Sequence, residues 1–123
     1  MPVIIQSKTR YTGTVSPSAL NTETTVIEIT AQSDDYIVEG WLDISALASG
    51  DTLVIKEYVS VDGTNYRLFL PPVTYNGPAD APAIRFHSKQ FTYNMKYKVT
   101  VTQTAGTLRS FPYRFLLEVL GTL

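Results

Sequence analysis

Residues 57–69 read EYVSVDGTNYRLF, and in this stretch two β-prone arms flank an Asp-Gly pair. A tight hairpin turn needs positive φ, which Gly63 reaches without steric cost and Asp62 tolerates. The arms carry Tyr, Val, Thr and Phe, residue types that suit a pleated, half-buried surface. The stretch therefore predicts a β-hairpin with a return strand over residues 66–70, in which Gly63 serves the backbone conformation and contacts no ligand.

Outside this hairpin the chain shows a hydrophobic period of two, which is typical of half-buried strands. The clearest alternation covers residues 95–102, where apolar side chains face one way and Lys and Thr side chains face solvent. About seven or eight strands at ten-residue spacing predict an all-β fold, an antiparallel β-sandwich or jelly roll. Further strands are expected over residues 25–31, 37–44, 53–59, 83–87 and 111–120.

Two segments depart from the alternation. Residues 1–22 are polar and are broken by Ser-Pro-Ser, so we expect an N-terminal arm there and a β-sandwich domain over 23–123. Residues 71–82 contain four prolines and one Asn-Gly. Because proline donates no hydrogen bond to a sheet ladder, this segment is excluded as a central strand and is expected to be the longest loop.

Composition restricts the function classes. The chain has 123 residues, 44% hydrophobic and 17% charged, which fits one folded domain. A net charge of −1 predicts neither a nucleic-acid nor a membrane partner. The N-terminal residues lack the layout of a signal peptide, so synthesis in the cytoplasm is expected. The absence of cysteine excludes disulfides and thiolate chemistry, and somewhat favours a bacterial, archaeal or viral origin.

No residue pattern predicts catalysis or a cofactor. His87 is the only imidazole, and neither metal-ligand spacing nor a serine nucleophile turn accompanies it. The acidic residues are expected in turns and on solvated faces, although a two-carboxylate glycosidase remains an alternative. Oxygen ligands at residues 34–35 or 62–65 also suit calcium, but ordinary turn chemistry is favoured. The sequence therefore predicts a non-enzymatic protein with no metal and no cofactor.

Several side chains are candidates for an interface instead. Trp41 shares a strand face with Glu39 and Asp43, so it is expected to stack on a sugar, to be covered by a neighbouring subunit or by the N-terminal arm, or to be buried in the core. Residues 115–120 are apolar on both faces, and a strand of that kind needs cover on both. The chain also has eight tyrosines, a residue type enriched at wet interfaces. The interface candidates are Trp41, Tyr58, Tyr75, Phe115, Leu116 and Leu120.

Residues 42–52, 58–66 and 103–113 resemble small β-proteins encoded among the structural genes of tailed bacteriophages, and the similarity spans residues 41–115. The resemblance implies a virion component, either a capsid decoration protein or a head or tail accessory subunit. It further implies binding to the major capsid protein or other virion subunits. A homo-oligomer is expected, with a trimer favoured by analogy with decoration proteins at capsid three-fold positions. The alternative is a carbohydrate-binding module that uses Trp41 and Tyr75.

Overall fold

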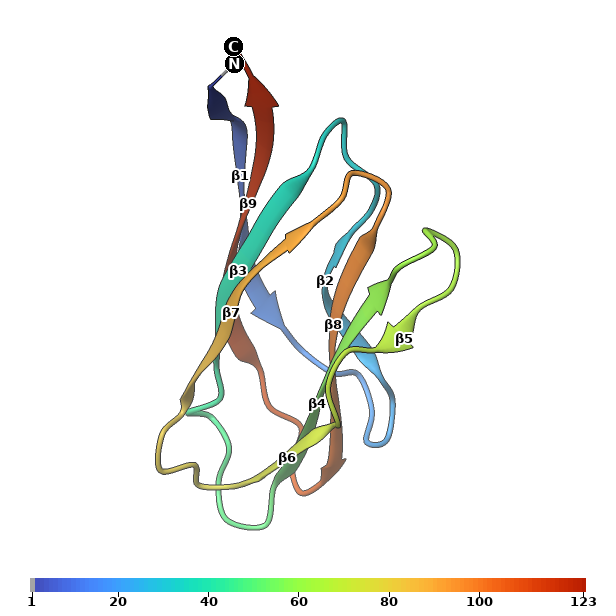
Figure 1. The fold of residues 1–123 in the computed structure, drawn as a ribbon. Helices are drawn as coiled ribbons and strands as arrows, with labels where there is room; N and C mark the ends of the chain where they lie inside the picture. The colour runs from blue at the N-terminus through green and yellow to red at the C-terminus, as the bar shows by residue number, and fades with distance from the viewer. Residues whose placement is uncertain (1) are drawn as a thin grey trace.

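The computed structural model describes residues 2–123, which form nine β-strands and no helix (Figure 1). The predicted all-β class is therefore confirmed. Every strand pairing is antiparallel. The strands are β1 Val3–Val15, β2 Thr24–Ile29, β3 Tyr36–Asp43, β4 Thr52–Ser60, β5 Arg67–Leu68, β6 Val73–Asn76, β7 Ala83–Phe91, β8 Lys96–Ala105 and β9 Phe111–Thr122.

The strands form two sheets that face each other. Sheet A has the order β1-β9-β3-β7, and sheet B has the order β2-β8-β4-β5, with the short strand β6 also paired to β4. The pairs are nested along the chain, since β1 pairs with β9, β2 with β8, β3 with β7, and β4 with β5 and β6. This is the arrangement of one long hairpin rolled into two sheets. The two predicted alternatives are thus resolved in favour of the jelly roll.

The hydrophobic core lies between the two sheets. Alternate residues of the central strands β3, β4, β8 and β9 point inward and are mostly buried. Tyr36 is fully buried on β3, and its hydroxyl donates a 2.6 Å hydrogen bond to the Met95 carbonyl, so burial leaves no polar atom of this ring unpaired. Burying a side chain such as Leu42 or Phe111 contributes about 1.5–3 kcal/mol to folding, which makes this layer the main source of stability.

Strand β1 occupies most of the segment in which the sequence predicted an arm. It pairs with β9 from Val3 opposite Thr122 to Val15 opposite Phe111, with one irregularity after Ile5. Almost all of its side chains are exposed, so backbone hydrogen bonds rather than apolar burial hold it. That is why no hydrophobic period revealed it. The paired ends of β1 and β9 extend beyond the rest of the sandwich, close to both chain ends (Figure 1).

The hairpin of residues 57–69 is present, but its turn is wider than predicted. The ladder between β4 and β5 ends at Val59 opposite Arg67, so the tight two-residue turn is wrong and the return strand is shorter. The Asp62 carboxylate organises the loop by accepting 2.8 Å hydrogen bonds from the backbone N–H groups of Thr64 and Asn65. These N–H groups, Asn65 first, hold the pKa of Asp62 well below its usual range.

Replacing Gly63 with Val is expected to lower the free energy of unfolding by about 1–3 kcal/mol, because a β-branched residue at positive φ is strained. Gly63 has a φ of 80°, and an added Cβ would lie 2.9 Å from the Asn94 carbonyl oxygen. Gly50→Val is the comparison variant: Gly50 has a positive φ of 90° but open space around its Cβ position, so this variant measures the backbone strain without the close contact. Urea denaturation measures both variants, and an unchanged midpoint for Gly63→Val would contradict the prediction.

The proline-rich segment 71–82 contains strand β6, which pairs with one end of β4, as in Tyr75 opposite Leu53. The prediction that this segment is not a central strand is confirmed, because β6 lies at the edge of sheet B. The prediction of one long loop is wrong, since all four prolines lie outside β6 and leave its ladder intact.

Asp51 joins two loops at one end of the sandwich. Its carboxylate is 2% exposed and accepts hydrogen bonds from the Ala48 and Thr107 backbone N–H groups at 2.8 and 2.9 Å. It also accepts a 2.7 Å hydrogen bond from the Arg109 guanidinium. The loop before β4 is thereby tied to the loop before β9. The Ala48 N–H and then the Arg109 side chain hold the pKa of Asp51 below its ordinary value.

Asp51 is expected to account for part of the acid lability of the fold. Because its folded pKa is lowered, its contribution is present above the unfolded value of about 4 and is lost as the pH falls through the folded value. Asp51→Asn should lower Tm by about 5 °C or more at pH 7 and flatten the fall of Tm at acid pH. Calorimetry between about pH 2 and 7 measures this, with the exposed Asp80→Asn as control. If Tm of Asp51→Asn falls with decreasing pH as steeply as Tm of the unaltered protein does, the prediction is refuted.

Candidate interaction surfaces

The outer face of sheet A presents Trp41 to solvent. Strand register places Thr12, Arg114, Trp41 and Arg85 in one row across β1, β9, β3 and β7. The Trp41 side chain is 48% exposed, whereas Leu42 beside it is buried. The alternative of core burial for Trp41 is therefore wrong, and the placement of Trp41 on a solvated strand face is confirmed.

Arg85 holds the Trp41 ring in place. Its guanidinium carbon lies 5.0 Å from the centroid of the indole ring, which is a cation–π contact. The same guanidinium donates a 2.9 Å hydrogen bond to the Glu39 carboxylate, which anchors it from the neighbouring strand. Two partners thus fix Arg85, and Arg85 in turn covers one face of the indole.

Two hollows adjoin Trp41 on this face. The larger, of about 260 Å³, lies toward β1 and is bounded by Arg10, Arg114 and Leu116. The smaller, of about 240 Å³, lies toward the start of β9 and is bounded by Asp43 and Pro112. Trp41 lines both, so it forms a ridge between two depressions. A partner protein can pack against an exposed tryptophan of this kind and insert its own side chains into the adjoining hollows.

The predicted candidates on β9 separate by face. Leu116 and Leu120 are half-buried on the outer face of sheet A, as an interface requires. Phe115 points inward, is 3% exposed, and lies 5.2 Å from the Phe86 ring centroid. Phe115 is therefore a core residue in this structure and offers no surface to a partner. A strand that is apolar on both faces, such as residues 115–120, predicts that both faces are buried, but it does not indicate which face packs in the core.

Tyr58 lies on the outer face of sheet B within a polar network. Its hydroxyl donates a 2.6 Å hydrogen bond to the Glu23 carboxylate, which Thr100 also contacts at 2.6 Å. The Lys98 ammonium lies 5.0 Å from the Tyr58 ring and 4.5 Å from the Tyr66 ring. Burial, with the Glu23 carboxylate, raises the pKa of Tyr58 to about 12, so the hydroxyl remains a donor. The Tyr58, Thr100 and Glu23 groups are thus paired with one another, whereas the buried Thr102 hydroxyl on β8 has no hydrogen-bond partner among the described residues.

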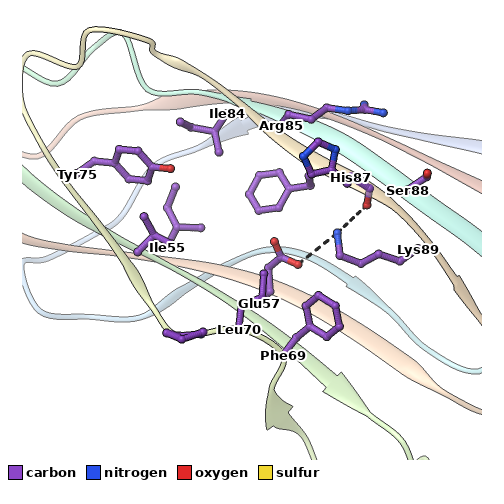
Figure 2. Close-up of a pocket in the computed structure, with 13 residues that line it drawn as sticks. Ile55, Glu57, Phe69, Leu70, Tyr75, Ile84, Arg85, His87, Ser88 and Lys89 are labelled. Carbon is purple, nitrogen blue, oxygen red and sulfur yellow. Dashed lines mark hydrogen bonds and ion pairs between the residues drawn. The ribbon is translucent and has the colours of Figure 1, made fainter.

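Tyr75 lines a third hollow, of about 370 Å³, at the open edge between β7 and the β5–β6 segment (Figure 2). We call it the edge groove. Phe69 borders it and is 46% exposed. Inside, the Lys89 ammonium lies 3.4 Å from the Glu57 carboxylate and donates a 2.6 Å hydrogen bond to the His87 carbonyl. The His87 imidazole is exposed at this rim.

Turn chemistry accounts for the carboxylates considered for calcium. Asp35 accepts a 3.0 Å hydrogen bond from the Tyr93 N–H, and Asp62 organises its own loop. Within residues 2–123 no three His, Cys, Asp or Glu side chains gather in a metal-binding arrangement. The same residues form no helix that is long and apolar enough to cross a membrane.

The molecule is thus a two-sheet jelly roll that exposes one tryptophan, Trp41, on an outer sheet face. No known family model and no curated protein matches the sequence. Among solved structures, a chain from infectious bursal disease virus, Gx strain, is similar with a TM-score of 0.50 and 14% identity, over 96% of this chain and 32% of that chain. The chain spans about a third of that viral chain, and at this identity the similarity shows the fold alone.

Two other structures are similar at lower scores. One belongs to the disulfide-linked pili of Bacillus endospore appendages, with a TM-score of 0.49 and 14% identity over 92% of this chain and 88% of that one. The other is the VP2 subviral particle of infectious bursal disease virus, with a TM-score of 0.45 and 11% identity. It is matched over 93% of this chain and 33% of the VP2 chain.

Proposed function

We propose that the chain is a non-enzymatic structural subunit of a virion, namely a capsid decoration protein that binds the major capsid lattice and stabilises it. The observation that carries the proposal is the half-exposed Trp41 ridge between two hollows, because tryptophans in such settings dominate protein–protein binding energy. The jelly roll supports it, since viral capsid domains commonly have this fold. The resemblance of residues 41–115 to tailed-phage structural proteins supports it as well.

The proposed mechanism is surface complementarity. A rigid two-sheet domain contacts neighbouring capsid proteins at once and resists their separation under internal pressure. The outer face of sheet A supplies the contact, since Trp41, Leu116 and Leu120 lie on that face and need cover. Assembly into a homo-oligomer, with a trimer favoured, would let one unit engage several capsid subunits and gain avidity.

Binding to capsids stripped of accessory proteins tests the proposal. The purified protein should co-sediment with them, and Trp41→Ala should weaken binding at least about thirtyfold, the loss typical of an interface hot spot. Tyr93→Ala is the control, because Tyr93 is 56% exposed but lies in the turn between β7 and β8. Light scattering gives the oligomeric state of the free protein. A stable monomer that ignores capsids would refute the proposal.

A carbohydrate-binding module is the second candidate, favoured by one observation: Trp41 is exposed among polar side chains on a sheet face. The structure places Tyr75 at the edge groove and not beside Trp41, so the two rings would form separate subsites. Binding to a glycan array that is lost in Trp41→Ala, without binding to capsids, would select this candidate instead.

A further inference from the structure

Two arginines beside Trp41 have no acidic partner among residues 2–123. Arg10 on β1 and Arg114 on β9 are exposed, and neither forms an ion pair with any of residues 2–123. Register places Arg114 opposite Thr12 and Arg10 opposite Leu116, so the two arginines are diagonal neighbours on one face. Both line the larger hollow, and a single group seated there can reach both guanidinium groups.

The charges around this hollow are unbalanced. Arg10, Arg85 and Arg114 face it, and Glu39, which is already paired with Arg85, is the acidic residue among its lining. The other acids of this face do not line the hollow: Asp43 borders the smaller hollow together with Arg114, and Glu118 lies opposite Lys8. The chain as a whole has a net charge of −1. A locally positive site on a weakly acidic protein favours an anionic ligand.

We propose that this hollow binds an acidic, extended segment of a partner protein. A carboxylate of the segment accepts hydrogen bonds from Arg10 and Arg114, because guanidinium groups bind carboxylates with two parallel bonds. A neighbouring apolar side chain packs against Trp41 and the half-buried Leu116. The inference rests on the proposed function in one respect: the partner that carries the segment is a capsid subunit.

An acidic polysaccharide is the competing ligand, and the geometry disfavours it. Arg85 already covers one face of the Trp41 ring, which leaves only the opposite face on which a sugar could stack. Leu116 forms an apolar part of the lining of the hollow, and it packs best against an apolar side chain, which a glycan chain does not carry. The combination of two uncommitted arginines with an apolar wall therefore fits a peptide in which acidic and apolar residues alternate.

The test uses Trp41 as its own reporter, because it is the only tryptophan in the chain. A blocked pentapeptide of alternating Glu and Leu is titrated into the full chain, and the matched peptide of alternating Gln and Leu is the control. We expect a saturable change in Trp41 emission with the acidic peptide, weakening between about 0.05 and 0.5 M NaCl. Arg10→Gln and Arg114→Gln should each weaken binding about tenfold or more. Arg67→Gln, which alters an exposed arginine on sheet B, should not.

Equal binding of the Gln peptide, equal weakening by Arg67→Gln, or tighter binding of oligogalacturonate at the same site would overturn the inference. The double variant Arg10→Gln/Arg114→Gln should also lose capsid binding at an unchanged Tm. If it binds capsids as the unaltered protein does, the inference fails while the proposed function stands. If the acidic peptide binds as expected and the unaltered protein ignores capsids, the site is supported and the proposed function fails.

Discussion

Replacing Gly40 with Ala is expected to lower the free energy of unfolding by about 3 kcal/mol, the upper end of what overpacking a core costs. Gly40 lies in the middle of β3, opposite Phe115 on one neighbouring strand and Phe86 on the other. An added Cβ would overlap three atoms of the Phe115 ring. The ring has little room to retreat, because the centroids of Phe86 and Tyr113 lie 5.2 and 6.3 Å away.

A second substitution separates this steric effect from a loss of backbone flexibility. Gly40→Ala combined with Phe115→Leu should recover part of the stability, because a smaller side chain leaves space for the new methyl group. Gly13→Ala is the control, since its Cβ would approach only the terminal hydroxyl of the Tyr113 side chain, at 3.0 Å, from an exposed edge strand. Urea denaturation measures the three variants, and a loss below about 0.5 kcal/mol for Gly40→Ala would contradict the prediction.

The strands were predictable because their faces differ in polarity. Residues 53–59 and 95–102 alternate clearly, and the structure has β4 and β8 there. The nested pairing was not predictable, since β1 and β9 come from opposite ends of the sequence and β1 buries little apolar surface. The shape of the 57–69 hairpin was missed for a local reason: the Asp62 side chain replaces backbone partners within the loop.

The candidate site was predictable only in part. Alternation placed Trp41 on the same face as Glu39 and Asp43 but left core burial open, and the exposure of Trp41 decides between the two. Arg10 and Arg114 could not be connected to it, because only strand register brings them to the same face. Glu57 had a usable signal that sequence reasoning passed over. It follows Leu53 and Ile55 on the apolar side of its strand, and an acid on an apolar face needs a buried partner.

That partner is Lys89, and the second large effect follows from it. Replacing Glu57 with Ala is expected to lower the free energy of unfolding by about 3 kcal/mol, because the largely buried Lys89 ammonium is left without a compensating charge. The Glu57 and Lys89 side chains are only 14% and 12% exposed, at 3.4 Å from each other. The Tyr97 hydroxyl also donates a 3.2 Å hydrogen bond to Glu57. One substitution therefore leaves the Lys89 ammonium without its counter-charge, with the His87 carbonyl as its remaining acceptor, and leaves the Tyr97 hydroxyl without its acceptor.

Matched variants decide whether the missing charge is the cause. Glu57→Leu with Lys89→Met should be more stable than Glu57→Ala, because replacing both ions with apolar groups leaves no unpaired charge. Glu39→Ala is the control for an exposed pair, since Glu39 and Arg85 are each 32% exposed and the expected loss is below about 1 kcal/mol. If Glu57→Ala lowers the free energy of unfolding no more than Glu39→Ala does, then water in the edge groove stabilises the Lys89 charge as well as the ion pair with Glu57 does. The difference between these variants thus measures how dry the edge groove is.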